Sequence, residues 1–418
     1  MAQRVTAFFL MGVLASASSL AQSTQPQPAH QHDTMAMSDR SWHVMQDGIA
    51  FLTFNQQGGP RGGREVQSQN WWMGMATHPA GGGQLSFNLM LSLEPWTTGR
   101  DGYREIFQAG EALDHVAVID RQHPHDFLMQ AAVVWRRPLV RGYTLTVAGA
   151  PVGEPALGPV AFMHRSSAAE FATAPLAHHT LDSTHIAMGV ATAGVERGPW
   201  QVEASLFHGR EPDDDRWDLM DAGRLDSWSA RGWYRPSPSW TFQISHGFLN
   251  EPETLESGDI RRTTASGSWT HRRPSRSDAI TLAYGRNNNE GADFSAVLAE
   301  STHTFGRNTF YGRFEAVQVE TDLLRFGIHA FVGGKKAHVP DDVDRVDVVR
   351  AFTVGAVRSV ARWSDWDFAA GGDLTAYGVP SVLKPTHGNH PLSLHIFIRV
   401  RPPSRERMSD VTMTRMMR

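Results

Sequence analysis

The amino-acid sequence predicts an all-β fold, namely an antiparallel transmembrane β-barrel with short periplasmic turns and long extracellular loops. Three observations lead to this fold. Apolar and polar residues alternate in many short segments, tight turns alternate with long connections between the segments, and an export signal precedes them. The number of segments predicts about 16 strands, within a range of about 14 to 18.

The alternation is clearest in residues 84–93, 240–248 and 392–401, where large apolar side chains occupy most second positions. Because successive side chains of a strand point to opposite faces, this period predicts strands with one apolar and one polar face. The predicted strands cover residues 48–55, 65–78, 83–93, 127–137, 141–150, 181–195, 199–208, 225–236, 238–249, 259–273, 277–286, 291–304, 308–319, 347–362, 366–376 and 391–401.

The connections orient the barrel. Beginning after the second strand, every other connection is a tight turn, at 79–82, 138–140, 196–198, 237, 272–275, 306–307 and 364–365. The connections between these turns are generally longer, as at 94–126, 151–180, 209–224, 320–346 and 377–390. Short turns on one rim and long loops on the other are typical of bacterial transmembrane barrels, and an even strand number leaves both termini on the periplasmic side.

One face of the predicted strands is apolar, whereas the other carries charges that a wet lumen tolerates and lipid does not. The predicted lumen residues are Glu203, Arg231, Arg313, Glu315, Asp373, His395 and Arg399. Tryptophans near strand ends predict an aromatic belt at the membrane interfaces: Trp71, Trp72, Trp96, Trp135, Trp200, Trp233, Trp240, Trp363 and Trp366. A soluble protein that buries the apolar row between two sheets is the alternative, because alternation does not say which face meets lipid.

The N-terminus has the three parts of a secretory signal peptide: Arg4, an apolar core at 7–14, and small residues that end at Ala21. We therefore predict a signal peptide at 1–21, a flexible Met/His-containing leader at 22–46, the barrel at 47–402 and a Met-rich tail at 403–418. The expected location is the outer membrane of a Gram-negative bacterium, after cleavage near Ala21.

Two long loops are rich in histidine and aspartate and belong to adjacent hairpins, so they can converge at the same mouth. Imidazole and carboxylate together suit transition-metal ions such as copper and zinc. The proline between His123 and His125 favours an extended segment that points both rings the same way. The candidate metal ligands are His123, His125, Asp126, His164, His178, His179, Asp182 and His185.

Other readings of these loops stay open. Inward-folded loops bury His, Arg and Asp that satisfy one another, so a purely structural network is one alternative. Asp182, Ser183 and His185 include the residue types of a hydrolase, although the chain has no G-x-S-x-G nucleophile elbow. We therefore assign no catalytic residue and no cofactor-binding residue. The cofactor stays open, with a transition-metal ion (copper or zinc) as the candidate.

Both tails carry candidate copper ligands, because copper accepts thioether sulfur and imidazole nitrogen. These residues are His30, His32, Met35, Met37, His43 and Met45 near the N-terminus, and Met408, Met413, Met416 and Met417 near the C-terminus. A disordered polar tail is the alternative.

The net charge of −4 argues against nucleic-acid binding, and the absence of cysteine excludes disulfides and thiolate metal sites.

The chain resembles an uncharacterised family of Gram-negative outer-membrane β-barrel proteins through D-R-Q-H-P-H-D at 120–126, G-E-P-A-L-G-P-V-A-F-M-H-R at 153–165 and H-H-T-L-D-S-T-H at 178–185. The resemblance implies a barrel and no particular activity. The Met/His leader is similar to that of copper-resistance outer-membrane proteins. The chain departs from such barrels after the last strand, where a tail ends in Arg418 instead of an aromatic residue, so an assembly signal is expected near Phe397.

Together these patterns predict an outer-membrane barrel that binds or passes a small solute, with transition-metal handling as its specialisation. A membrane-embedded hydrolase and a structural barrel without transport are the alternatives. The expected partners are outer-membrane lipid, the outer-membrane assembly machinery and a small solute or metal ion.

Overall fold

The computed structural model describes residues 41–114, 116–219, 223–254, 258–289, 292–326, 331–332, 335–336 and 345–403. The predicted signal peptide, most of the predicted leader and nearly all of the predicted Met-rich tail lie outside these ranges, so their assignments stay predictions. Of the predicted soft ligands in the tails, only His43 and Met45 lie within the described residues, in the first strand.

One large antiparallel sheet forms the barrel. Its strands are β1 (His43–Gln57), β2 (Gly63–Gln67), β3 (Asn70–Ala80), β4 (Gly83–Leu91), β7 (Leu128–Pro138), β8 (Tyr143–Gly153), β9 (Ala187–Arg197), β10 (Trp200–His208), β11 (Ser227–Ser237), β12 (Trp240–Leu249), β13 (Ile260–Arg273), β14 (Arg276–Asn289), β15 (Ala292–Phe305), β16 (Asn308–Glu320), β19 (Val346–Trp363), β20 (Trp366–Gly378) and β21 (Leu392–Arg401).

The remaining elements lie in connections. They are the hairpin β5 (Tyr103–Leu113) and β6 (Val116–Gln122), the short pair β17 (Phe331–Val332) and β18 (Lys335–Lys336), and the helices α1 (Glu94–Thr97), α2 (His178–Leu181), α3 (Thr321–Phe326) and α4 (Lys384–His387). In the described part of the chain, no helix is long and apolar enough to cross a membrane.

The sheet closes on itself because β1 pairs with β21 as well as with β2 and β3. β2 and β3 pair with successive parts of β1 and so occupy one position, which reduces the 17 strands of the sheet to 16 positions. At the closing seam, Phe51 of β1 packs edge-on against Phe397 of β21, with ring centres 5.1 Å apart. The predicted all-β barrel of about 16 strands is confirmed.

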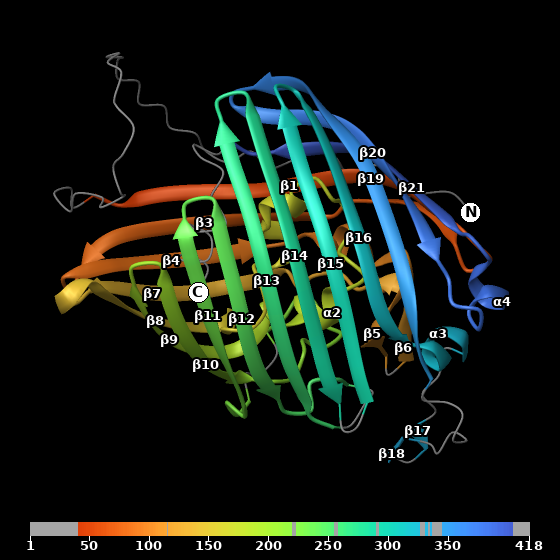
Figure 1. Cartoon of the computed structure of the whole chain (residues 1–418), viewed down its shortest axis with the longest axis horizontal. Helices are drawn as coiled ribbons and strands as arrows, with labels where there is room; N and C mark the ends of the chain where they lie inside the picture. The colour runs from red at the N-terminus through yellow and green to blue at the C-terminus, as the bar shows by residue number, and fades with distance from the viewer. Residues whose placement is uncertain are drawn as a thin grey trace. The chain divides into compact units, whose positions relative to one another are not determined.

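The two rims differ as predicted. Turns of two residues connect β3 to β4, β13 to β14, β15 to β16 and β19 to β20. In Figure 1 the turns after β13 and β15 lie at the top, and α3, β17 and β18 lie at the opposite end, with the long loops. Positive φ angles at Gly81 and Gly82 (59° and 72°) allow the tightest turn geometry between β3 and β4. We call the two ends the turn side and the loop side.

The outer surface of the barrel is apolar and its interior is polar. On β10 and β12 the side chains of Val202 and Ile244 are 64% and 63% exposed, whereas the inward Glu203 is 2% exposed. A soluble β-sandwich would show the opposite arrangement, because it buries its apolar row. The exposed apolar band is the surface that lipid contacts in a transmembrane barrel.

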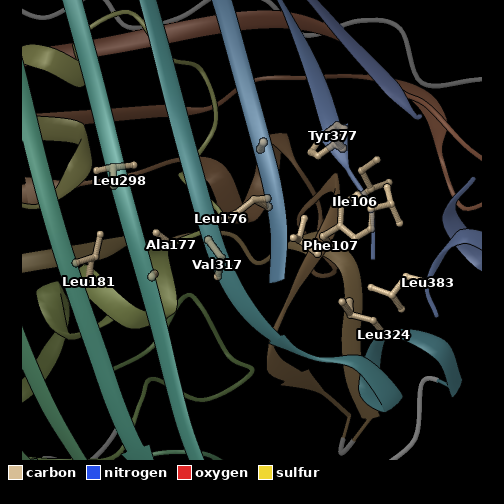
Figure 2. Close-up of a cluster of buried hydrophobic side chains, with 14 of the residues drawn as sticks. Ile106, Phe107, Leu176, Ala177, Leu181, Leu298, Val317, Leu324, Tyr377 and Leu383 are labelled. Atoms are coloured by element: carbon tan, nitrogen blue, oxygen red, sulfur yellow. The ribbon is translucent and has the colours of Figure 1, made fainter. Parts of the chain in front are cut away.

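Two connections fold into the interior. Residues 154–186, here called the inner loop, are all buried or half-buried, and α2 lies within this loop behind β14 and β15 in Figure 1. The β5–β6 hairpin, here called the inner hairpin, lies beside it. Figure 2 shows Phe107 of the inner hairpin and Leu176 and Leu181 of the inner loop in one buried cluster with Leu298 and Val317 of the barrel wall. Apolar packing therefore holds both segments inside the barrel.

Three sequence-based details differ from the structure. The predicted strand at 181–195 begins only at Ala187, because α2 and a 3-10 turn at 183–185 occupy its start. The predicted strand at 65–78 is interrupted between β2 and β3. Trp233 is buried inside the barrel, where its indole N–H donates to Glu203, so it does not belong to an interfacial belt.

Candidate functional site

The inner loop is fixed to the barrel wall along its whole length. Near its start, the Arg231 guanidinium of β11 donates to the carbonyl oxygens of Leu157 and Gly158 (3.2 and 3.0 Å) and pairs with Glu203 at 2.8 Å. Gly158 has φ +81°, and a Cβ there would lie 2.6 Å from the carbonyl oxygen of Leu181. The loop therefore requires glycine where its two arms approach each other.

Arg165 anchors the middle of the inner loop. Its guanidinium donates to Glu300 of β15 at 2.6 Å and to both carboxylate oxygens of Asp182 at 2.9 and 3.0 Å. A third contact reaches the carbonyl oxygen of Val160 at 2.9 Å. Because Arg165 is only 1% exposed, these partners compensate a charge that burial would otherwise make costly.

The predicted lumen residues lie on the inward face, and several hold the inner loop. Glu315 accepts the backbone N–H of Ala177 at 3.0 Å, Arg313 donates to the carbonyl oxygen of Thr173 at 3.3 Å, and Arg399 pairs with Glu170. His395 instead bonds Asp373 of the neighbouring strand at 2.7 Å. These lumen charges therefore act first as anchors of the inner loop.

Six of the predicted metal ligands are histidines, and the structure brings their rings into one cluster. Ring centres are 5.2 Å apart for His178 and His179, 5.4 Å for His178 and His185, and 5.5 Å for His125 and His185. His123 lies 5.7 to 6.4 Å from His179, His178 and His125. We call these five residues and His164, which packs edge-on against Trp71 at 4.7 Å, the histidine cluster.

Hydrogen bonds fix the tautomers of two rings. His125 Nδ1 lies 2.8 Å from a Glu94 carboxylate oxygen, and His185 Nδ1 lies 2.6 Å from the Asp182 carbonyl oxygen. Both oxygens only accept, so in the neutral rings Nδ1 carries the proton and Nε2 carries the lone pair. Neither Nε2 has a hydrogen-bond partner although both are buried. This arrangement is the one in which outer carboxylates and carbonyls orient metal-binding imidazoles.

Burial keeps several of these rings neutral. Burial is the main cause that lowers the pKa of His164 to about 3, and the neighbouring His185 and His125 add to this effect. Burial and His125 likewise lower the pKa of His185 to about 3, against a slight opposing effect of the Asp182 carbonyl. Burial also lowers the pKa values of His178 and His123 well below the usual range. Neutral imidazoles retain the lone pair that a metal ion needs.

The two predicted carboxylate ligands are engaged elsewhere. Asp126 forms an ion pair with Arg216 at 3.1 Å, and Asp182 forms the pair with Arg165. Across the described part of the chain, no group of three or more histidine, aspartate or glutamate side chains is arranged to hold a metal ion. The histidine rings are thus neighbours in one cluster, but among the described residues they are not arranged around one point as the ligands of a metal ion would be.

Ser183, His185 and Asp182, the residues of the possible hydrolase, do not form a catalytic triad of nucleophile, base and carboxylate. Ser183 accepts a hydrogen bond from Arg262 at 2.6 Å, and the Asp182 carboxylate is occupied by Arg165. His185 Nδ1 bonds the backbone oxygen of Asp182 and not its carboxylate. These contacts stabilise the loop and do not activate a hydroxyl.

Two cavities lie on opposite sides of the inner loop. The turn-side cavity, of about 80 Å³, is lined by Gly48, Arg401 and Ser277 near the tight turns, and by His125 and His164 of the histidine cluster. The loop-side cavity, of about 150 Å³, is lined by His179 and by Glu211, Glu253 and Glu320 near the long loops. The histidine cluster therefore lies between the two cavities.

Sequence reasoning missed two residues of this site. Glu300 occupies an inward position of β15, so the same alternation that predicts Arg313 on the next strand could have found it. Glu94 lies just after β4, in a helix of four residues with no periodic pattern, and no sequence signal links it to His125.

No protein-family model matches the chain, and no curated protein matches its sequence. Its fold is similar to that of the anion-selective porin from Comamonas acidovorans, with 11% identity, a TM-score of 0.52 and coverage of 87% of this chain and 100% of the porin. It is also similar to the high-pH structure of OprB from Pseudomonas putida, with 9% identity, a TM-score of 0.53 and coverage of 87% and 94%. At these identities the similarity shows the fold alone, and the resemblance to a specific barrel family stays a prediction.

Closed antiparallel barrels with this loop layout and an apolar outer band reside in the outer membrane of Gram-negative bacteria. The 16 strand positions, the two unlike rims and the exposed apolar row all belong to that class. The chain is an outer-membrane β-barrel, and membrane lipid surrounds it.

Proposed function

We propose that this barrel binds small solutes in its lumen and passes them selectively across the outer membrane. The observation that supports this function is a polar lumen divided by the inner loop, with one cavity facing each rim. An inward loop at this position restricts what reaches the other side, as constrictions do in channels that select by size and charge.

The inner loop limits the solute. Residues 154–186 fold into the lumen and are all buried or half-buried, and one cavity lies on each side of them. We therefore expect passage of small ions, and exclusion of larger nutrients while the inner loop is in place.

Conductance across planar bilayers tests this function. The wild-type barrel is compared with a variant in which residues 159–181 are replaced by a short Gly/Ser linker, after circular dichroism has verified that both fold into the same sheet. We expect small current steps from the wild type and larger steps from the variant, because the linker leaves the lumen open. An absence of steps from both proteins would support a structural barrel without transport.

A second candidate function is transition-metal handling, with copper or zinc as the ion. It is favoured by the buried and unpartnered Nε2 atoms of His125 and His185, whose orientation Glu94 and the Asp182 carbonyl fix. Imidazole is a ligand that both metals accept. The ion would approach as a solute, and His125 and His185 would supply lone pairs to it.

Metal titration of the refolded protein tests the second function. His125→Ala and His185→Ala should each lower zinc or copper affinity strongly, and Glu94→Gln should lower it by about 10- to 100-fold, because an orienting partner is lost. His246→Ala is the matched control, since His246 is exposed on β12 and bonds only Thr263 among the described contacts. No metal bound above background by the wild type would exclude this function.

A further inference from the structure

The turn side of the barrel carries a patch of arginines at the ends of three neighbouring hairpins, β13–β14, β15–β16 and β19–β20, two of whose turns lie at the top of Figure 1. Backbone hydrogen bonds join these ends, because the Gly306 N–H donates to the Ser275 carbonyl oxygen at 2.8 Å and the Ser359 N–H to that of Arg307 at 2.9 Å. Six exposed arginines lie here, and we call them the arginine rim: Arg272, Arg273, Arg276, Arg307, Arg358 and Arg362.

The arginine rim has an excess of positive charge. Of the described acids at these hairpin ends, only Asp365 is exposed, whereas Asp278 is buried beside Arg276 and Asp367 is half-buried. A surface with charges of one sign concentrates ions of the opposite sign. The rim is therefore expected to attract anions.

Three members of the rim have no carboxylate partner among the described residues. Arg273 donates to His271 at 2.9 Å, Arg358 donates to the Asn308 side-chain oxygen at 2.7 Å, and Arg307 lies in the turn between β15 and β16. Their positive charges are not compensated within these hairpin ends, so an anionic partner would compensate them.

The arginine rim continues the lipid-facing surface of the barrel. On β19, Arg358 follows the exposed Phe352 and Val354 at every second position, so all three lie on the outward face. Arg276 lies over the ring of the exposed Phe305, with its guanidinium carbon 4.8 Å from the ring centre. Arginine stems can cover apolar surface while their charged ends reach the headgroup level.

We propose that the arginine rim binds the headgroups of anionic phospholipids in the leaflet that surrounds the turn side. A guanidinium presents parallel N–H groups that match the oxygens of a phosphate. Basic residues beside a membrane surface attract anionic lipids, and each contributes about fivefold to the affinity. This inference goes beyond solute passage and does not depend on it, because Arg276 and Arg358 lie on the outer face of the barrel.

The position of the rim favours a lipid over a soluble polyanion. A phosphate bound at Arg276 or Arg358 leaves attached acyl chains against the exposed apolar residues of the same outward faces, such as Ile280 and Val354. The exposed Trp363 and Trp366 lie at the same end of the barrel, and tryptophan is enriched at the level of lipid headgroups. A soluble polyanion would gain the charge contacts alone.

Native mass spectrometry of the full-length barrel in detergent tests the proposal. The protein is titrated with phosphatidylglycerol or with phosphatidylethanolamine of the same acyl chains, and the dissociation constants of the first bound lipids are compared. We expect the wild type to prefer phosphatidylglycerol. The triple variant Arg273→Gln, Arg307→Gln and Arg358→Gln should lose at least about fivefold in affinity for this lipid. Arg272 is left unchanged because it also lines the turn-side cavity.

The matched control removes three exposed arginines from the loop side, as Arg100→Gln, Arg286→Gln and Arg345→Gln. Each of these arginines pairs with an acid, at 2.9, 2.5 and 2.6 Å. The control carries the same change in net charge and should keep the affinity of the wild type for phosphatidylglycerol.

Equal affinities of the two triple variants for phosphatidylglycerol would overturn the proposal, and so would equal binding of both lipids by the wild type. Tripolyphosphate that binds the wild type as tightly as phosphatidylglycerol would identify a site for soluble polyanions and exclude the lipid. If the rim variant fails to fold, the salt dependence of the wild type decides. Raising ammonium acetate from about 0.1 to about 1 M shortens the Debye length from about 10 to about 3 Å, and a lipid preference that survives this change contradicts binding by exposed arginines.

Discussion

Arg165 is the residue that attaches the middle of the inner loop to the barrel wall. It holds Asp182 of the inner loop and Glu300 of the wall at once, and all three side chains are buried. In Arg165→Met, the Asp182 carboxylate loses its cation and Glu300 keeps only Arg313, at 3.3 Å. Breaking a buried pair in this way costs about 3 to 5 kcal/mol. We expect the variant to unfold at lower urea concentration and to expose the inner loop to protease.

The matched control for this prediction is Arg286→Met. Arg286 pairs with Asp293 at the exposed loop side of β14 and β15, where solvent screens the interaction. Its replacement should leave both the urea midpoint and the protease pattern close to those of the wild type. Equal behaviour of the two variants would contradict the anchoring role of Arg165.

At the residue scale, sequence reasoning placed the charged residues of the strands correctly, although it placed Trp233 of β11 on the wrong face. Arg231, Arg313 and Arg399 are recognisable because a charge at every second position must face away from lipid, and all three lie inside the barrel. Their partners in the inner loop could not be predicted, because Glu170 and the carbonyl oxygens of Leu157 and Thr173 follow no period and reach the wall only through tertiary packing. The same limit applies to Glu94, which orients His125.

At the scale of elements, the inner hairpin carries a buried acid whose protonation affects its attachment. Burial is the main cause that raises the pKa of Glu105 well above its usual value of 4.5, and the negative charge of Glu315 adds to this effect. Since the folded-state pKa is the higher one, the stability that protonated Glu105 contributes is complete below pH 4.5 and is lost as the pH rises through the folded-state pKa. We expect hydrogen exchange at 103–122 to become faster as the pH rises from 5 through the folded-state pKa of Glu105.

Glu105→Gln should remove this dependence, because the amide stays neutral at every pH. The exchange rate in the hairpin, corrected for the intrinsic effect of pH, would then be flat across the same range. Glu251→Gln is the control, since Glu251 is exposed in the connection after β12. A persistent pH effect in Glu105→Gln would assign it to another group.

The strands were predictable and the inner loop was not, for a physical reason. A strand between lipid and lumen repeats every two residues, so each of the 16 predicted segments found its strand. Inside the lumen the backbone is held by side chains, as when Arg262 donates to the carbonyl oxygen of His179 at 2.8 Å. Such local support lets the end of α2 and the 3-10 turn at 183–185 replace the first part of the strand predicted at 181–195.

For the whole molecule, the apolar outer band predicts how the barrel tolerates charge. Ile244→Arg places a cation on the lipid-facing side of β12, which should cost about 2 to 4 kcal/mol if the position lies near the middle of the bilayer. Leu219→Arg is the control, because Leu219 is similarly exposed but lies in the connection between β10 and β11. Urea unfolding in liposomes should show a loss of stability for Ile244→Arg alone.

The anchors of the inner loop also impose an order of assembly. Arg399 and Arg401 of β21, the strand that closes the barrel, hold Glu170 and the carbonyl oxygen of Ala169, more than half of the chain earlier. Contacts between such distant positions form late, because long chain segments must be ordered first. The inner loop therefore gains these two anchors only once the final strand is in place, so closure of the barrel and attachment of its loop are coupled.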